Sequence, residues 1–264
     1  MKTFHTKVTT LVLNFCLGSL LFSASACAQE DYTPKKYMGL KGKVACIRDT
    51  TYDYTLTGFN AGSGKLMEVK AIDFDAEGNA IKIIKHNADS SYVAIYSSVY
   101  KDNILFSGKG QTHIGEDVLS YSMELIGTDN DTLLYKESND SRQEGLRKIK
   151  TTGKYHLESS TSETGTTTDE TWADDHHNII RTRFLVISNE VEFSNGTHTL
   201  EQINTMKYDK DGNMIENVHI EGNDTTTTTV SHHLYDKHGN WTEERSETNG
   251  YYKQLVKRTI KYAE

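Results

Sequence analysis

The sequence predicts an all-β protein built as an array of antiparallel β-hairpins. Polar and apolar side chains alternate along most of the chain, as between Leu119 and Leu125, which is typical of strands with one face in water. Turn-forming residues recur at intervals of about 23 to 35 residues, several of them near 27, the length of one hairpin. Proline, which removes a donor from a sheet ladder, occurs only at Pro34. These observations predict a meander that forms one long twisted sheet, and they leave open whether it curls into a partial barrel.

A six-residue turn motif marks three of the expected hairpins. It consists of an aromatic residue, Asp, two variable residues, Gly and Asn, at 74–79, 208–213 and 235–240. The Asp carboxylate can accept hydrogen bonds from N–H groups further along the turn, and Gly supplies a positive φ. We therefore expect a structural role in hairpin register for Asp75, Gly78, Asn79, Asp209, Gly212, Asn213, Asp236, Gly239 and Asn240.

Residues 1–28 have the pattern of an export signal. Two lysines precede the apolar segment 8–22, which is too short to span a bilayer, and small residues follow it. The tripeptide Ser25-Ala26-Cys27 resembles the end of a bacterial lipoprotein signal, in which Cys27 is the lipidation site. The alternative is ordinary cleavage after Ala28, which removes Cys27.

Residues 29–38 are polar and predict a flexible tether, and residues 39–264 predict a single β-hairpin repeat domain. Without the two lysines of the signal, 27 basic and 37 acidic residues remain, which gives a net charge of −10 with His neutral. Such a balance argues against nucleic acid as a partner. A membrane is expected as a partner only through a lipid on Cys27. The expected location is the outer membrane or cell surface as a lipoprotein, or the periplasm or medium if Cys27 is not lipidated.

The expected turns follow one another at regular intervals along the domain. They centre near residues 77, 102, 129, 152, 176, 211 and 238, and the one at Asp174–Asn178 is a degenerate copy of the motif. Seven such units predict roughly 13 to 16 antiparallel strands.

The Tyr-Asp-x-x-Gly-Asn motif resembles the YD (Rhs-type) repeat. The opening residues 40–44 and 50–52, and the closing residues 235–242 and 257–262, are similar to small YD-repeat-like lipoproteins of Bacteroidota. The match covers the beginning and end of the mature chain well and the middle poorly. The resemblance implies an exported hairpin array and brings no established activity with it.

Metal and cofactor sites are not expected from the sequence. An EF-hand-like loop aligned on Gly212 would place Lys207 at its first ligand position and Val218 at its twelfth, where acidic residues are needed. The histidines also occur as adjacent pairs, His176-His177 and His232-His233. Adjacent side chains on a strand point to opposite faces of the sheet, so such a pair cannot readily bind one metal ion.

The acidic pairs Asp174-Asp175 and Glu243-Glu244 carry no further signature of glycoside hydrolysis. Trp172 and Trp241 stand beside turn motifs and are candidate binding aromatics for sugars or peptides. The alternative is that they pack against cross-strand neighbours and stabilise the register.

Three functions are compatible with these features. The first is a non-enzymatic, exported cell-envelope protein that uses a β-sheet face for binding or a structural role, with an envelope protein or a glycan as partner. The second is an envelope glycan hydrolase, which requires a concave cleft with converging carboxylates or His from different hairpins. The third is a carrier of a lipid or small molecule, which requires the sheet to close around an apolar cavity.

Overall fold

The structure is a computed structural model that describes residues 38–55, 59, 64–140, 144–163, 165–188 and 198–264. The expected export signal with Cys27 and residues 29–37 of the expected tether lie outside the described residues. Within the described residues, no helix is long and apolar enough to cross a membrane.

Sixteen β-strands make up the secondary structure of the described residues, which confirms the all-β prediction. They are β1 (Val44–Asp53), β2 (Lys65–Phe74), β3 (Ala80–Asn87), β4 (Tyr92–Lys101), β5 (Ile104–Ile114), β6 (Asp117–Asp129), β7 (Thr132–Asn139), β8 (Glu144–Thr152), β9 (Tyr155–Ser162), β10 (Gly165–Ala173), β11 (Ile179–Ser188), β12 (His198–Tyr208), β13 (Met214–Glu221), β14 (Asp224–Tyr235), β15 (Trp241–Thr248) and β16 (Tyr252–Tyr262).

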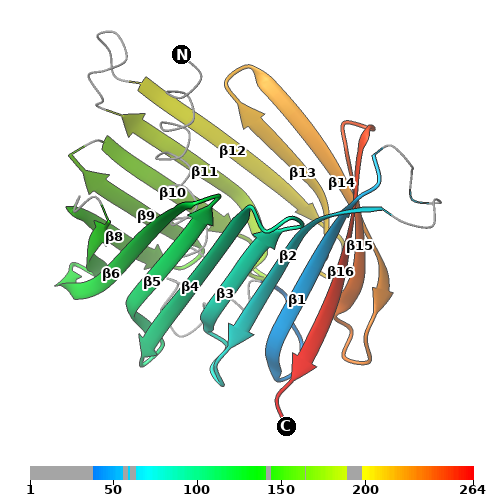
Figure 1. Cartoon of the computed structure of the whole chain (residues 1–264), viewed down its shortest axis with the longest axis horizontal. Coiled ribbons are helices and arrows are strands. Elements are labelled where there is room, and N and C mark those ends of the chain that lie inside the picture. The colour runs from blue at the N-terminus through cyan, green and yellow to red at the C-terminus, as the bar shows by residue number, and fades with distance from the viewer. Residues whose placement is uncertain (1–37, 56–58, 60–63, 141–143, 164, 189–197) are drawn as a thin grey trace.

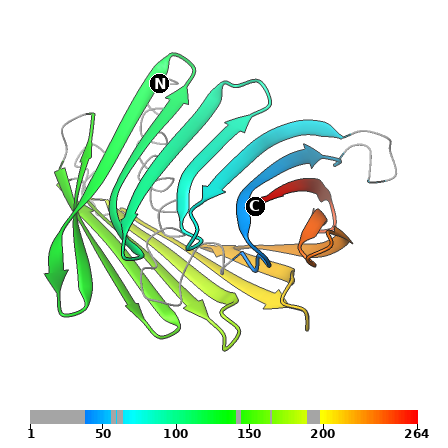
Figure 2. The same ribbon diagram turned by 90° about the horizontal axis from the view of Figure 1, so that it is seen from below.

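The strands form a closed antiparallel barrel in which each strand pairs with its neighbours in the chain (Figure 1). The first and last strands close it, in a register that runs from Val44 opposite Tyr262 to Asp53 opposite Gln254. Figure 2 shows the same barrel from below, with β1 beside β16. The sheet that the sequence left open or partly curled is therefore closed, and it has no free edge strand.

All seven expected turns lie at one end of the barrel. Because successive strands are antiparallel, every turn from an even-numbered to an odd-numbered strand falls at the same end, which we call the motif end. The C-terminus also lies there, because β16 runs toward it (Figure 1).

Four turns at the motif end share one hydrogen-bond pattern. In the first, Asp75 N–H donates to Asn79 O at 3.0 Å, Gly78 N–H donates to Asp75 O at 3.2 Å, and Asn79 N–H donates to Asp75 Oδ1 at 2.8 Å. The same three bonds recur at 174–178, 209–213 and 236–240. The residue that donates the second of these bonds has a positive φ in each turn: Gly78 (93°), His177 (66°), Gly212 (83°) and Gly239 (79°).

A register shift next to the aromatic end of the incoming strand accompanies each of these turns. The shifts fall at Asp73/Phe74, Trp172/Ala173, Lys207/Tyr208 and Leu234/Tyr235. Such bulges strengthen the local twist of a sheet. The motif therefore combines a tight turn with a local distortion of the strand that precedes it.

The inward-facing side chains differ between two overlapping sectors of the barrel. From β1 to β8 they form the main apolar cluster, which includes Ile47, Ile72, Tyr96, Leu105 and Tyr135. From β7 to β10 the interior holds buried charged groups, and Arg147 (1% exposed) is the largest fully buried side chain. Apolar packing and an ionic network thus occupy different sectors of one interior.

Candidate functional site

A pocket of about 870 Å³, here called the end pocket, opens at the motif end of the barrel. Its walls are residues 38–41, residues from the turns at 174–178 and 209–213, and Gly239 and Asn240 from the last turn. Its remaining lining comes from strand ends: Ile180, Met206, Lys207, Tyr208, Met214, His232, Trp241 and Glu244. The turn motifs thus surround a concave surface.

Asn240 ties the N-terminal segment to this end of the barrel. Its Nδ2 donates to Lys41 O at 2.9 Å and to Tyr262 Oη at 2.7 Å, and its Oδ1 accepts from Lys41 N–H at 2.7 Å. In the motif copies at 79, 178 and 213, the Asn Nδ2 bonds instead to the Asp carboxylate of its own turn. Leu40, next to Lys41, is buried in the apolar cluster. The last motif copy therefore holds one wall of the end pocket.

A hydrogen bond between His232 and Glu244 lies in the lining of the pocket. The two residues sit opposite each other on β14 and β15, and Nε2 lies 3.0 Å from Oε2. The His232 side chain is 4% exposed and that of Glu244 is 19% exposed. The imidazole thus positions a carboxylate that still reaches solvent in the pocket.

Trp241 lies beside this pair. Its ring centroid is 5.3 Å from that of His232 and 3.6 Å from the guanidinium carbon of Arg258. Arg258 in turn donates from Nε and Nη2 to the two carboxylate oxygens of Asp49, both at 2.7 Å. The bidentate pair fixes Arg258 over the indole, which is a favourable cation–π arrangement. Trp241 is therefore held in one orientation.

Two of the turn carboxylates in the pocket, Asp174 and Asp209, are engaged in hydrogen bonds within their own turns. Burial opposes ionisation of Asp174 and Asp209, but hydrogen bonds from Asn178 and His176, and from Asn213 and Asp211, outweigh it and lower the pKa of both carboxyls. The lining as a whole holds four carboxylates and three lysines, so its charge is nearly balanced. The pocket lining is therefore polar, and it does not strongly favour anions or cations.

The structure separates the two candidate tryptophans. Trp241 lines the end pocket, whereas Trp172 does not. Trp172 lies on β10, where its ring is 5.4 Å from that of Tyr155 and 5.0 Å from the Arg181 guanidinium carbon. The motif residues Asp75, Gly78 and Asn79 also stand outside the pocket lining, in the β2–β3 turn.

Metal binding finds no geometric basis in the described part of the chain, where no three His, Cys, Asp or Glu side chains are placed to hold an ion. His176 and His232 both line the end pocket, on different hairpins.

A buried ionic network was missed by the sequence reasoning. Arg147 donates to both Glu137 and Glu158, and Tyr121 and Ser160 also donate to Glu137. All of these residues are at inward positions of neighbouring strands. In the sequence, a strand with polar residues on its inward face has the same alternating pattern as a strand with polar residues facing solvent, so the pattern does not reveal the network. The network is closed to solvent, so it is a structural element and not a binding site.

Comparison with known proteins adds no assignment. The chain matches no protein-family model, and no curated protein matches it.

Proposed function

We propose that this chain is a non-enzymatic, exported cell-envelope protein whose end pocket binds a neutral, hydroxyl-rich ligand such as a segment of a glycan. One observation carries the proposal: Glu244, held by His232 beside the fixed indole of Trp241, faces a polar pocket of nearly balanced charge. Ligand pockets commonly combine a few well-placed polar groups with an aromatic surface.

The chemistry of the lining favours hydroxyl groups. A carboxylate accepts hydrogen bonds and cannot donate them, and one Glu244 oxygen already contacts His232. Hydroxyl groups of the ligand would supply donors to the carboxylate and acceptors for the lysines of the rim. A strongly charged ligand would meet groups of both signs, so a neutral ligand fits the lining better.

The envelope location rests on the sequence. The export signal, the lipoprotein-like Cys27 and the resemblance to YD-repeat lipoproteins support an exported chain, anchored to a membrane where Cys27 is lipidated. The first described residues of the chain, 38–41, line the end pocket.

The two alternative functions fit the geometry less well. A glycosidase needs a carboxyl whose pKa is raised so that it can act as an acid, whereas the pKa values of Asp174 and Asp209 are lowered. A carrier needs an apolar cavity, whereas the buried apolar side chains of β1 to β8 pack against one another.

Tryptophan fluorescence can test ligand binding directly. The chain has two tryptophans, so Trp172→Phe in the full-length protein leaves Trp241 as the only indole. Titration with a panel of neutral oligosaccharides should give a saturable change in emission for at least one of them. Glu244→Gln should weaken that binding about tenfold, the cost of one charge-assisted hydrogen bond.

Glu247→Gln is the matched control, because Glu247 lies on the same strand outside the pocket lining. Absence of saturable binding by any oligosaccharide to the folded protein would overturn the proposal. Release of shorter sugars by the wild type and not by Glu244→Gln would instead support the hydrolase.

A further inference from the structure

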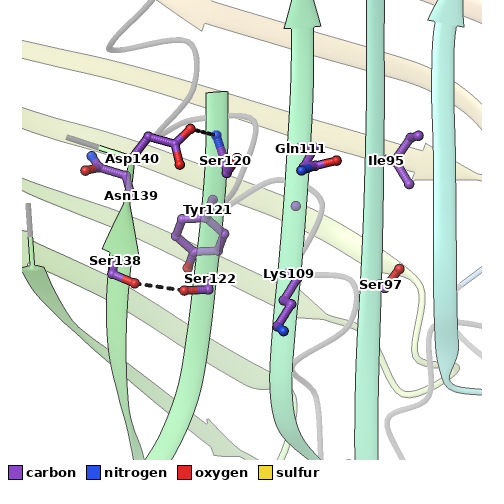
Figure 3. A pocket seen from close by; sticks show the side chains of 11 residues that line it. Ile95, Ser97, Lys109, Gln111, Ser120, Tyr121, Ser122, Ser138, Asn139 and Asp140 are labelled. Atoms are coloured by element: carbon purple, nitrogen blue, oxygen red, sulfur yellow. Dashed lines mark hydrogen bonds between the residues drawn. The ribbon is translucent and has the colours of Figure 1, made fainter. Parts of the chain in front are cut away.

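A second hollow, here called the outer groove, crosses β4 to β7 and has a volume of about 430 Å³ (Figure 3). Most of its side chains stand on the face opposite the buried Ala94 and Tyr96, so the groove lies on the outer wall of the barrel. Tyr121 and Asn139, which also line it, belong to the inward row of Tyr96. It is separate from the end pocket, with which it shares no lining residue.

The strand register builds the groove from two parallel rows. One row runs across the strands through Ser97, Lys109, Ser122 and Ser138, and the other through Ile95, Gln111 and Ser120 toward Asp140. Short serine side chains therefore form much of its surface. Ser122 and Ser138 hydrogen-bond to each other through their hydroxyls at 2.8 Å.

Gly110, between Lys109 and Gln111, allows the wall to be thin at this point. A Cβ on Gly110 would lie 2.6 Å from the ring of Tyr96, which fills the interior behind the groove. No larger residue fits there without a shift of the buried tyrosine, so the backbone of β5 is held close to the core.

Two opposite charges stand on either side of β6 in the groove. Lys109 is exposed on β5, and Asp140 follows the end of β7 (Figure 3). Ser120 N–H donates to Asp140 Oδ2 at 2.6 Å, which orients this carboxylate. None of the ion pairs found among the described residues includes Lys109 or Asp140.

The distance between Lys109 and Asp140 indicates the length of a ligand that could contact both residues. Two strand spacings and one pair of residues along a strand place the Cα atoms of Lys109 and Asp140 about 12 Å apart. An extended peptide of three residues spans about 10 Å, which is similar to this Cα separation.

We propose that the outer groove binds a short zwitterionic peptide of about three residues, with its carboxylate at Lys109 and its ammonium at Asp140. The serine hydroxyls and the Gln111 amide between these ends supply both donors and acceptors, which peptide N–H and C=O groups require. A neutral glycan offers no opposite charge to either Lys109 or Asp140. The groove therefore favours a peptide over a sugar.

Isothermal titration calorimetry of the full-length protein with triglycine tests this proposal. Triglycine should bind saturably, and N-acetyl-triglycine and triglycine amide should each bind at least tenfold more weakly. Lys109→Ala and Asp140→Asn should reduce the affinity for triglycine by a similar factor. The Asp140→Asn substitution keeps an oxygen that can accept the hydrogen bond from Ser120 N–H. Lys150→Ala, at an exposed position on β8, is the matched control and should change nothing.

Circular dichroism of each variant verifies that the barrel is folded. Equal binding of free and capped peptides, or equal binding by Lys109→Ala and the wild type, would overturn recognition of the two termini. Saturation of the groove by a neutral oligosaccharide and not by triglycine would identify a sugar site in its place. Glu244→Gln should leave triglycine binding unchanged, so failure of this proposal is distinguishable from failure of the end-pocket proposal.

Discussion

Arg147 illustrates, at the scale of single residues, how the barrel keeps charges in its interior. It lies between Glu137 and Glu158, and Asp169 follows on the next strand, opposite Glu158. One arginine thus lies near three carboxyl groups. His156 is also close, with its Nε2 3.9 Å from Glu158 Oε2. Removal of one member of a buried ion pair commonly costs several kcal/mol, because the other charge is left uncompensated. The network therefore specifies how β7 to β10 pack.

Asp169 should make the stability of the barrel depend on pH. Burial and, secondarily, the negative charge of Glu158 raise its carboxyl pKa from 3.8 to about 7. The folded state thus holds this proton more tightly than the unfolded state does. Its stabilising effect is complete below pH 4 and is lost as pH rises to about 7, a change of about 4 kcal/mol.

Asp169→Asn should remove this dependence, because Asn does not titrate. Urea unfolding at pH 5 and pH 8 measures the pH dependence of the free energy of unfolding. Between pH 5 and pH 8, this free energy should fall less in the variant than in the wild type. Asp117→Asn, at an exposed position, serves as control. Equal losses in Asp169→Asn and the wild type would show that Asp169 does not titrate in this range.

At the scale of elements, the turn motif acts through hydrogen bonds within each hairpin. Asp209 accepts from the N–H groups of Asp211 and Asn213 and from the Asn213 side chain. The side chain of Asp211 has no such role and is exposed. The two acids of this turn are therefore not equivalent, although sequence places both beside the same glycine.

Asp209→Ala should lower the free energy of unfolding by about 1–2 kcal/mol, because it leaves two backbone N–H groups and the Asn213 side chain without their acceptor. Asp211→Ala should change it by less than about 0.5 kcal/mol, as is usual at exposed positions. Chemical denaturation of both variants gives the comparison. A larger effect of Asp211→Ala would mean that the exposed acid, and not the turn bonds, matters.

At the scale of the whole molecule, closure of the barrel depends on contacts between residues that are far apart in the chain. Asn240 joins Lys41 to Tyr262, and Ala263 N–H donates to Lys43 O at 2.7 Å. Arg258 joins β16 to Asp49 of β1. The first and last strands are thus linked by side chains as well as by their ladder.

Asn240→Ala should weaken this seam specifically. It removes three hydrogen bonds between segments, whereas Asn213→Ala removes side-chain bonds only within one turn. Hydrogen–deuterium exchange should become faster in 44–53 and 252–262 for Asn240→Ala and remain near wild type there for Asn213→Ala. Equal exchange in the two variants would show that the ladder alone closes the barrel.

The hairpins, the seven turns and the antiparallel order were predictable from the sequence because they depend on local features. Alternation with period two specifies a strand, and the motif around Gly212 or Gly239 specifies a turn with positive φ. The degenerate copy was recognisable because Asp174 and Asn178 keep the spacing that the turn bonds require.

Closure and the sites depended on the tertiary structure. The pairing of β1 with β16 joins residues about two hundred positions apart, and no local pattern encodes that contact. Only closure shows that Arg147 and Glu158 face inward, that Glu244 and Trp241 share a pocket, and that Lys109 and Asp140 border one groove. Local side-chain chemistry by itself determined a β-hairpin protein, whereas long-range strand pairing decided which polar residues are buried and which meet at a site.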